Sequence, residues 1–403
     1  MNNTAKLIKL GNIADVMQGQ SPESEYYSEE IGTPFLQGNR TFGNLYPVFD
    51  TYTTKVTKLA RQGDVLMSVR APVGDLNIAP SDLCIGRGLA SLRSKVGSNY
   101  FIYYSLKHSI ANLQRQGAAT TYSSVNKDII NEFDVIVPNN DNSWDLIAKF
   151  LFNIDKKIEL NNKLNQQLED MAKFLYDYWF VQFDFPDENG KPYKSTGGKM
   201  VWNDEVKREI PAGWEVVDLC KLENNVVTGK TPSTSNKEYY GNEIPFITIG
   251  DIRGNMHITD TEIKLSVKGA DSQKNKYIPA GSLCVTCIAS PGLIGFSTEL
   301  SQTNQQINSV VIKNKENKTY LYFALKDYFK YSPGAKAGNT FANMNKGDFE
   351  SIKLISPPKE LKIEFEETVR PSVDQLENNS KQNYYLAQLR DWLLPLLMNG
   401  QVS

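Results

Sequence analysis

Apolar residues recur at alternating steps of about four and three in two long stretches of the chain. The first stretch runs from about Trp144 to Phe180, and its apolar positions are Ile147, Leu151, Ile154 and Ile158, then, after one slip, Leu164, Leu168, Met171 and Leu175. The second runs from about Leu361 to Leu397 and contains Val369, Val373 and Leu376, then Leu386, Leu389 and Leu393. This spacing is typical of coiled coils. We predict two long helices, each spanning about 50 Å at about 1.5 Å per residue.

Asparagines interrupt both apolar seams midway, at Asn161 and Asn162 in the first stretch and at Asn378 and Asn379 in the second. Polar residues in a seam fix the register of paired helices at some cost in stability. A lone helix cannot bury its apolar stripe, so each helix is expected to pair with the other. If a pseudo-two-fold axis relates the two halves of the chain, the helices run antiparallel and hold two globular domains at a fixed separation.

Short β-rich runs, broken by Gly and Pro, fill about 130 residues before each helical stretch; DVLMSVRAPVGD and FDVIVP are examples. Such runs predict an irregular sheet with long loops, with one helix near YFIYYSLKHSI. The segment between the halves is rich in Gly, Pro and Lys, which is typical of a linker. The predicted boundaries are a first domain over 1–143, a central helix over 144–182, a linker over 183–213, a second domain over 214–360 and a C-terminal helix over 361–403.

The two halves of the chain carry an internal repeat, which outranks other signals in assigning a fold. VMQGQSP at residues 16–22 matches VVTGKTP at residues 226–232. Further matches follow in the same order: Tyr26-Tyr27 with Tyr239-Tyr240, Pro34-Phe35 with Pro245-Phe246, Gly63 with Gly281, Leu106-Lys107 with Leu325-Lys326, Asn126-Lys127 with Asn345-Lys346, and Pro138 with Pro357. The predicted fold class is therefore α+β: two similar mixed α/β domains, separated by two long helices that form an antiparallel coiled coil.

Composition places the chain among globular proteins, because 40% of its 403 residues are apolar and 11% are aromatic. The longest apolar run, WLLPLLM, is far shorter than the roughly 20 residues that span a bilayer, and no charged-then-apolar leader begins the chain. We expect a cytoplasmic protein without a membrane partner. The net charge of −2 gives no basic signature, although partner subunits can neutralise phosphates in a nucleic-acid complex.

Two short motifs suggest ligands that their surroundings disfavour. Gly229, Lys230 and Thr231 resemble the end of a phosphate-binding loop, but Asn224 stands where that loop needs its first glycine, so a strand ending in a turn is favoured. Cys284 and Cys287 lie in a buried strand pattern, where residues three apart point to opposite faces. We predict no metal site there.

Catalytic alternatives remain open at this stage. Asp187, Glu205 and Lys207 match the carboxylate-carboxylate-lysine pattern of metal-dependent nucleases, although no strand is expected between Asp187 and Glu205 to support it. Ser356-Pro357-Pro358 matches a methyltransferase loop, but Lys359 stands where an aromatic ring should stack on a flipped base.

The two histidines also offer no catalytic centre. His108 and His257 have no evident nucleophile or base partner, and we expect both on a helix or loop surface. No catalytic residue is predicted, and a coiled-coil scaffold without a DNA role is the remaining alternative.

A pair of similar but non-identical domains suits duplex DNA with two unlike half-sites. The segment FLQGNR offers Gln37, Asn39 and Arg40, and ITIGDIR offers Asp251 and Arg253 at the corresponding place. Arginine prefers guanine and Asn or Gln prefers adenine, through bidentate hydrogen bonds that contribute about 1–3 kcal/mol of discrimination. Each of these residues is equally compatible with an ordinary turn.

The chain resembles a known family, the specificity subunits of type I restriction-modification systems. The resemblance covers essentially the whole chain and is sharpest in GDVLMSVRAPVGDLNIA with IGRGLASL, in the FLQGN-like stretches, and in FDFPDENGKPYKSTGGKMVWND and REIPAGW. It implies two target recognition domains that recognise a bipartite, asymmetric site in double-stranded DNA. It also implies helices that bind two modification subunits, with restriction subunits completing the complex. The partners would use S-adenosylmethionine, ATP and Mg²⁺, whereas this subunit would be non-catalytic and without a cofactor.

Residue by residue, the resemblance and the repeat together place candidate DNA contacts on the loops of both domains. The first domain supplies Gln37, Asn39, Arg40, Ser68, Arg70 and Arg87, and the second supplies Lys230, Thr248, Asp251, Arg253 and Gln306. GAATTYSSVNK and AGNTFANMNK precede each domain's closing strand and supply Thr121, Tyr122, Thr340 and Phe341. These four either contact backbone phosphate or cap a helix.

Overall fold

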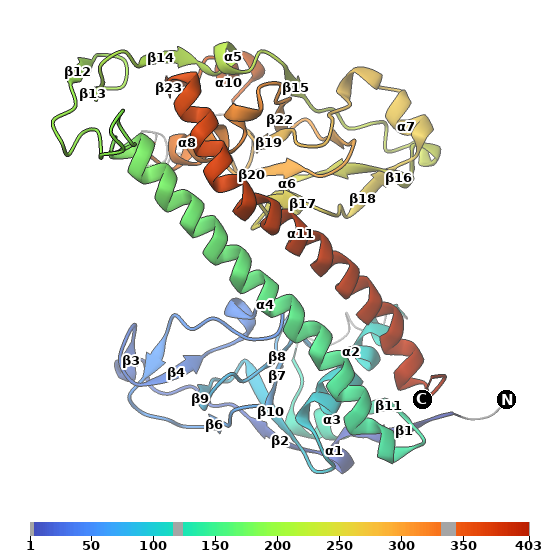
Figure 1. The fold of residues 1–403 in the computed structure, drawn as a ribbon. Coiled ribbons are helices and arrows are strands. Elements are labelled where there is room, and N and C mark those ends of the chain that lie inside the picture. The colour runs from blue at the N-terminus through green and yellow to red at the C-terminus, as the bar shows by residue number, and fades with distance from the viewer. Residues whose placement is uncertain (1–3, 116–123, 332–343, 403) are drawn as a thin grey trace. The chain divides into compact units, whose positions relative to one another are not determined.

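The computed structural model describes residues 4–115, 124–331 and 344–402. Backbone contacts divide the chain into two compact units, the first made of residues 1–160 with 385–403 and the second of residues 161–384 (Figure 1). The two long helices are α4 (Trp144–Tyr176), continued by a π-helical turn over Asp177–Val181, and α11 (Lys359–Met398). Each therefore contributes one part of its length to each unit. The helix pattern in the sequence is confirmed, whereas the predicted domain boundaries stay a prediction.

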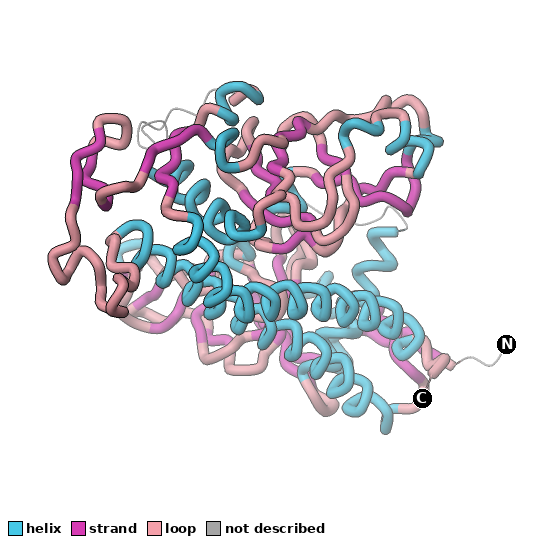
Figure 2. The backbone as a smooth tube through the Cα atoms, turned by 45° about the horizontal axis from the view of Figure 1, so that its top comes forward, coloured by secondary structure: helices cyan, strands magenta, loops and turns pink. Residues whose placement is uncertain are grey.

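The first unit contains short strands, joined by the long loops that Figure 2 shows in pink. Its elements in chain order are β1 (Ala5–Lys9), α1 (Leu10–Ile13), β2 (Ala14–Gln18), β3 (Tyr27–Ser28), β4 (Thr33–Leu36), β5 (Tyr52–Thr53), β6 (Leu59–Ala60), β7 (Val65–Ser68), β8 (Leu76–Ile78), β9 (Leu83–Ile85), β10 (Leu89–Ser94), α2 (Asn99–Arg115), α3 (Lys127–Asn131) and β11 (Asp134–Pro138). The sheets have the strand orders β2-β10-β7-β8, β3-β5-β4-β9-β6 and β1-β11.

The second unit repeats this plan. Its elements are β14 (Glu215–Asp218), α5 (Leu219–Leu222), β15 (Val226–Thr228), β16 (Tyr240–Ile247), α6 (Ile249–Ile252), β17 (His257–Ile258), β18 (Ile263–Leu265), α7 (Val267–Asp271), β19 (Leu283–Thr286), β20 (Ile294–Ser297), β21 (Gln302–Thr303), β22 (Ile307–Val310), α8 (Lys318–Tyr331), α10 (Lys346–Glu350) and β23 (Lys353–Ser356). The order β15-β22-β19-β20 corresponds to β2-β10-β7-β8, and the parallel pair β16-β21 corresponds to β4-β9. The shared topology confirms the internal repeat.

Residues that match between the repeats hold the same local structure. Asn126 caps α3 by accepting a 2.9 Å hydrogen bond from the Ile129 amide, and Asn345 caps α10 in the same way. Gly63 and Gly281 both adopt a positive φ, of 85° and 80°, in the turn that leads into β7 or β19. Such a φ is readily adopted only by glycine, which explains why this residue recurs.

The predicted slip in the first apolar seam is wrong. After Ile158, the buried and half-buried positions of α4 continue at steps of three and four through Asn161, Asn165, Leu168 and Ala172. Two residues assigned to the seam, Leu164 and Met171, are instead 40% and 57% exposed, and Leu389 on α11 is 41% exposed. Hydrophobicity alone misplaced the seam, because asparagines occupy its central positions.

These asparagines are satisfied across the helix pair, which is why they tolerate burial. Asn161 Nδ2 donates to Gln382 Oε1 and to Asn383 Oδ1, both at 2.8 Å. Asn379 Nδ2 donates to Asn165 Oδ1 at 2.8 Å. Residues later in α4 therefore contact residues earlier in α11, so the helices of the second unit are antiparallel, as predicted. The fixed separation between the two domains stays a prediction.

Within each unit, apolar side chains of the long helices pack against the rest of that unit. In the first unit, Phe101 of α2 stacks on Trp144 of α4 with ring centroids 4.4 Å apart, and Leu394 and Met398 of α11 join the same cluster. In the second unit, Tyr176 packs between Phe323 of α8 and Phe365 of α11. Burial of this apolar surface is the main force that holds helix and sheet together. None of the described helices has the length and apolar character needed to cross a membrane.

Candidate nucleic-acid interface

Three loops meet at one edge of the first unit: residues 19–22 after β2, residues 37–41 after β4, and residues 86–88 between β9 and β10. The Gly19 amide donates to the Leu89 carbonyl at 2.9 Å, and the Gln20 amide donates to the Ile85 carbonyl at 2.9 Å. A Cβ atom on Gly19 would lie only 2.2 Å from the Gly86 carbonyl oxygen. The first loop therefore packs so closely on the third that only glycine fits.

The second unit brings together the corresponding loops, residues 229–232, 248–253 and 304–306. The Gly229 amide donates to the Ile307 carbonyl at 3.1 Å, and the Lys230 amide donates to the Thr303 carbonyl at 2.9 Å. A Cβ atom on Gly229 would lie 2.1 Å from the Asn304 carbonyl oxygen. GQSP and GKTP are thus the same packed turn at the end of a strand, and the prediction of a strand and turn at Gly229 is confirmed.

Tyrosines at matching positions brace this turn. The Tyr27 hydroxyl donates to the Pro22 carbonyl at 3.2 Å, and the Tyr240 hydroxyl donates to the Pro232 carbonyl at 3.0 Å. A hydroxyl bonded to a turn carbonyl satisfies a backbone acceptor that the turn leaves open. The repeat of the tyrosine pair in the sequence therefore reflects support of the loops.

Of the candidates on the first unit's loops, Gln37, Arg70 and Arg87 have exposed side chains. Arg40 is exposed but forms an ion pair with Asp50 at 2.6 Å, and Asn39 Nδ2 donates to Asp75 Oδ2 at 2.6 Å. Gln37 and Arg40 line a hollow of about 300 Å³. The loops thus present one amide and several guanidinium groups to solvent.

Ser68 lies elsewhere, at the end of the buried strand β7. Its side chain is almost fully buried, its hydroxyl donates to the Pro72 carbonyl at 2.7 Å, and it accepts from the Asp75 amide at 2.8 Å. Both hydrogen-bonding functions are used inside the protein. In this conformation Ser68 shapes the turn before Asp75 and offers nothing to a ligand.

The second unit's candidates divide in the same way. Lys230 and Arg253 are exposed. Asp251 Oδ2 accepts from the Thr248 amide and hydroxyl, both at 2.7 Å, and Asp251 Oδ1 accepts from the Glu262 amide at 3.0 Å. Thr248 and Asp251 therefore close the start of α6 as a capping pair. Gln306 is half-buried and accepts from Asn304 Nδ2 at 3.1 Å.

Sequence matching missed one residue, Gln305. In the first unit Leu36 of β4 pairs with Ile85 of β9, and in the second Ile247 of β16 pairs with Thr303 of β21. Ile85 and Thr303 are therefore equivalent, which makes Gln305 the counterpart of Arg87. The Gln305 side chain is exposed, and its Oε1 accepts from Thr231 Oγ1 at 2.7 Å. Neighbouring glutamines made the choice ambiguous in the sequence, and only the strand register resolves it.

Four predicted residues cannot be placed. Thr121, Tyr122, Thr340 and Phe341 lie outside the described residues.

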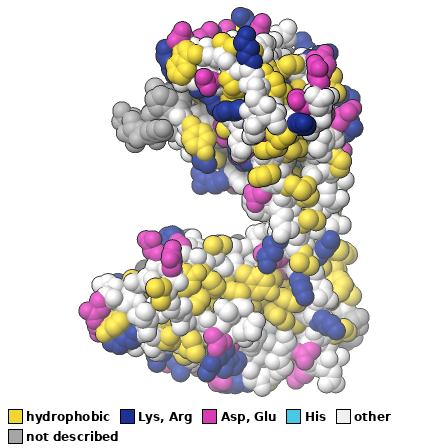
Figure 3. Space-filling view, turned by 60° about the vertical axis from the view of Figure 1, so that its left-hand side comes forward, with side chains coloured by type: hydrophobic (Ala, Val, Ile, Leu, Met, Phe, Trp, Pro, Cys, Tyr) yellow, Lys and Arg dark blue, Asp and Glu magenta, His cyan; other side chains and the backbone are white. Residues whose placement is uncertain are grey.

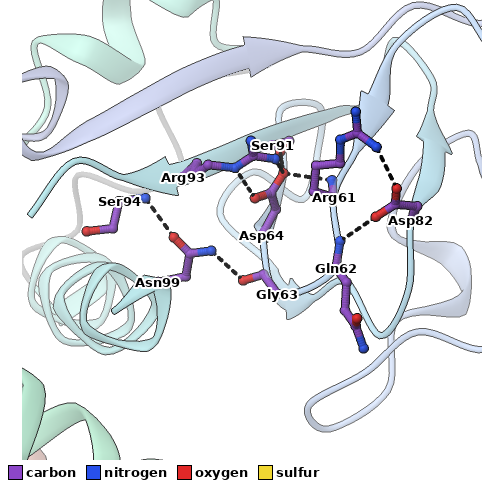
Figure 4. A network of polar contacts seen from close by, with 9 residues as sticks. All are labelled: Arg61, Gln62, Gly63, Asp64, Asp82, Ser91, Arg93, Ser94 and Asn99. Carbon is purple, nitrogen blue, oxygen red and sulfur yellow. Dashed lines mark hydrogen bonds and ion pairs between the residues drawn. The ribbon is translucent and has the colours of Figure 1, made fainter. Parts of the chain in front are cut away.

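A polar network centred on the buried carboxylate of Asp64 connects strands of the first unit (Figure 4). The Asp64 carboxylate accepts from Arg93 Nε and Nη2, both at 2.8 Å, from Ser91 Oγ at 2.8 Å and from the Arg61 amide at 2.9 Å. Hydrogen bonding to Asp64 raises the pKa of the Arg93 guanidinium. Nearby, Asn99 Nδ2 donates to the Gly63 carbonyl at 2.9 Å. The network ties the turn before β7 to β10 and α2.

The nuclease alternative does not survive in the structure. The expectation that no strand lies between Asp187 and Glu205 is wrong, because β12 (Met200–Asn203) and β13 (Arg208–Pro211) form an antiparallel hairpin. Even so, Asp187 binds the backbone amides of its own turn, which lowers its pKa, and Glu205 pairs with Lys353 at 3.0 Å. Lys207 lies 3.8 Å from Asp204. Across the described residues, no cluster of three or more His, Cys, Asp or Glu side chains is arranged to hold a metal ion.

The two cysteines of the C-x-x-C motif point to opposite faces of their sheet, as predicted. Cys284 packs in a cluster with Ile247 and Ile307, whereas Cys287 packs in the main core of the second unit. Burial raises the pKa of Cys284 to about 12 and that of Cys287 to about 11. Thiols of this kind are poor nucleophiles and poor metal ligands at neutral pH.

The methyltransferase alternative also lacks a site. Ser356 ends strand β23, and α11 begins at Lys359, directly after the two prolines. The proline pair therefore marks the boundary between a strand and a helix.

The expectation that the histidines lie on the surface is wrong. His108 is buried in α2, and His257 is buried in β17. The His257 ring is tilted against that of Phe296, with centroids 5.7 Å apart, and its Nε2 lies 3.9 Å from Glu377 Oε2. Burial lowers the pKa of His257 to about 4. Packing against other elements covers both side chains, which the local sequence did not reveal.

Comparisons with known proteins agree with this architecture. The model of the type I restriction modification DNA specificity domain matches residues 2–170 and again 211–383. The HindI specificity subunit of Haemophilus influenzae is 34% identical over 331 residues, covering 70% of this chain and 72% of that protein. The MjaIX specificity subunit of Methanocaldococcus jannaschii is 26% identical over 416 residues, covering 98% of this chain and 92% of that protein.

A solved structure supports the fold. The type I restriction-modification S subunit from M. genitalium superposes with a TM-score of 0.61 at 15% identity, covering 98% of this chain and 96% of that one. Two matches to one DNA specificity domain model agree with two units of one topology, which indicates a duplicated specificity protein. The chain belongs to the specificity subunits of type I restriction-modification systems.

Proposed function

We propose that each unit recognises one half of a bipartite, asymmetric site in double-stranded DNA. The observation that supports this most directly is the meeting of the same three loops in both units, with exposed Gln37 and Arg87 on one and Lys230 and Gln305 on the other. Amide and guanidinium groups form the bidentate pairs that distinguish bases in the major groove, and lysine contributes phosphate contacts. Because the exposed residues differ between the units, the two half-sites differ.

Exposed apolar side chains on the two long helices support a second part of the proposal, the docking of two modification subunits. Met171 and Phe174 on α4 are 57% and 68% exposed, and Leu389 and Trp392 on α11, each 218 residues later, are 41% and 64% exposed. Figure 3 shows apolar side chains at the surface among lysines and arginines. Contiguous exposed apolar side chains mark protein interfaces. Their recurrence at matching positions favours two equivalent partners.

Restriction subunits would join through these partners, which would also bring S-adenosylmethionine, ATP and Mg²⁺. We propose no cofactor for the specificity subunit itself, since its role is recognition. The cytoplasm, where bacterial and archaeal DNA lies, is the proposed place of action.

Replacing residues 7–140 with the same region of another specificity subunit tests the DNA proposal. The hybrid and the parent chain are each assembled with the modification subunits, and bound duplexes are selected from a random-sequence pool and sequenced. We expect a two-part motif of which only one half changes in the hybrid, because each unit contacts its own half-site. Absence of sequence enrichment by the parent complex would favour a scaffold, and a change in both halves would contradict independent recognition.

Charge substitutions on the helices test the docking proposal. Phe174→Glu and Trp392→Glu are each expected to reduce the complex from two modification subunits to one, because a carboxylate resists burial in an apolar interface. Gln167→Glu is the matched control, as it introduces the same charge at an exposed position of α4. Particle masses from analytical ultracentrifugation measure the stoichiometry. Two bound subunits in both variants would exclude these residues from the interface.

A further inference from the structure

Each unit contains a hydroxyl that holds a glutamine side chain at the meeting point of its loops. In the first unit, Ser21 Oγ donates to Gln37 Oε1 at 2.9 Å. In the second, Thr231 Oγ1 donates to Gln305 Oε1 at 2.7 Å. Both glutamines are exposed to solvent. Exposed glutamines ordinarily sample several rotamers, so a fixed amide at this place is a distinct feature.

The two hydroxyls are equivalent, but the two glutamines are not. Ser21 and Thr231 each stand two residues after the glycine that packs on the third loop, and the backbone bonds of Gly19 and Gly229 match. Gln37 follows strand β4, whereas Gln305 follows strand β21, the counterpart of β9. Both units therefore contain the same hydroxyl-amide pair, although the glutamine comes from a different loop in each. If the hydrogen bond served only to shape one particular loop, the glutamine would be expected on the same loop in both units.

The chemistry of a held glutamine amide matches adenine. In Gln305, one lone pair of Oε1 is occupied by the hydroxyl, and the amide still offers one acceptor and the two N–H donors of Nε2. In Gln37, the Tyr27 hydroxyl, which also donates to the Pro22 carbonyl, lies 3.4 Å from Oε1 as well, so adenine would replace that longer contact. Adenine presents an N6 amino donor beside the N7 acceptor in the major groove, and glutamine pairs with both. Fixing the amide before binding reduces the entropy lost in forming these bonds.

A residue with a cationic side chain adjoins each of the two hydroxyls. The backbone amide of Arg87 donates to Ser21 Oγ at 3.3 Å, which places the exposed Arg87 beside the first pair. Exposed Lys230 directly precedes Thr231 in the second. Positive charge at this position attracts DNA phosphate and guanine, so the amides lie where a duplex would be drawn.

We propose that Gln37 and Gln305 each select one adenine, in the first and second half-sites respectively, and that Ser21 and Thr231 are positioning residues that orient them. This inference rests on the proposed recognition of DNA by both units. It assigns a specificity role to Gln305 and to the two hydroxyls, and it gives the half-sites an adenine in common.

Selection from a random duplex pool by the full chain, assembled with its modification subunits, tests the assignment. Gln305→Ala is expected to reduce the preference for adenine at one position of one half-site by roughly 5- to 150-fold, the range expected for one bidentate pair. Gln37→Ala should do the same in the other half-site only. Gln305→Glu should shift the preference toward cytosine, whose N4 amino group donates to a carboxylate. Gln167→Ala, which removes an exposed glutamine amide from α4 instead, is the matched control and should leave the motif unchanged.

The hydroxyl's role is tested by Thr231→Val and Thr231→Ser. The valine removes the hydroxyl at nearly constant shape and should weaken the same adenine preference, whereas the serine keeps the hydroxyl and should retain it. Binding to non-specific duplex should be equal in both, because Lys230 is unchanged.

The possible failures are distinguishable. A parent complex that enriches no motif would overturn the proposed function itself. A parent motif that persists unchanged in Gln305→Ala, or one without adenine in either half, would overturn only the inference. If Gln305→Ala lost all DNA binding, the Gln305→Glu variant would decide: an unchanged base preference in that variant would also contradict the inference.

Discussion

The turn before the central strand follows one backbone path in both units but is stabilised by different side chains. The Gly63 amide donates to the Ala79 carbonyl at 2.8 Å, and the Gly281 amide donates to the Ser297 carbonyl at 2.7 Å. The next residue is Asp64 in the first unit, buried against Arg93, and Ser282 in the second.

Neutral hydroxyls replace the ion pair in the second unit. Ser282 Oγ donates to the Pro279 carbonyl at 2.7 Å, and the Ser282 amide donates to Ser297 Oγ at 3.1 Å. Val311 stands at the position equivalent to Arg93, as the register of β22 with β19 shows. The glycine turn and the strand pairing therefore define this part of the fold. The buried polar groups can differ between the units as long as each has a hydrogen-bond partner.

The largest expected effect comes from introducing the first unit's buried aspartate at the equivalent position of the second unit. Ser282→Asp buries a carboxylate without a cation, and we expect a loss of more than about 3 kcal/mol in the unfolding free energy of the second unit. Adding Val311→Arg should restore part of that loss by recreating the pair. Urea titration combined with hydrogen exchange of Leu283–Thr286 measures the change. No rescue in the double variant would show that the two sites are not interchangeable.

The reverse replacement should cost less. Asp64→Ser removes the acceptor for Ser91 and for the Arg61 amide, but Arg93 is half-exposed and can turn to water. We expect a loss of about 2 kcal/mol in the unfolding free energy of the first unit. Hydrogen exchange of Val65–Ser68, with Leu283–Thr286 as the internal control, reports it. Equal losses of unfolding free energy from the two replacements would contradict this comparison, because they would imply that the charge of the buried carboxylate does not matter.

A smaller contrast concerns pH. Both units bury a histidine, His108 in the first and His257 in the second, and His257 lies among charged side chains. Its environment includes Glu377, Lys318 and Lys381, and burial lowers its pKa to about 4. The folded state then excludes a proton that the unfolded state binds below its pKa of about 6.5. Stability should be fully present above about pH 6.5 and fall by up to about 1.4 kcal/mol per pH unit toward pH 4.

Urea midpoints between about pH 7 and about pH 5 test this contrast. His257→Leu should flatten the pH dependence of the second unit and leave that of the first unaltered. An unchanged slope in the variant would assign the effect to other groups.

Local pattern was enough to predict the helices, the repeat and the family. Heptad spacing is a property of neighbouring residues, and matches such as Gly63 with Gly281 or Asn126 with Asn345 mark backbone conformations that few residues adopt. Exposed Gln37 was predicted from its residue type in FLQGNR, and exposed Arg87 was placed by the resemblance to the family.

The sequence by itself thus determined that two similar α/β domains alternate with two long helices. Tertiary structure alone decided which asparagines fill the seam, that His257 is covered, that Ser68 and Asp251 serve their own turns, and that Gln305 stands opposite Thr231. Each of these depends on hydrogen bonds or packing between residues far apart in the chain. Such partners leave no periodic trace in the sequence, because the energy of a buried polar group depends on what faces it across the fold.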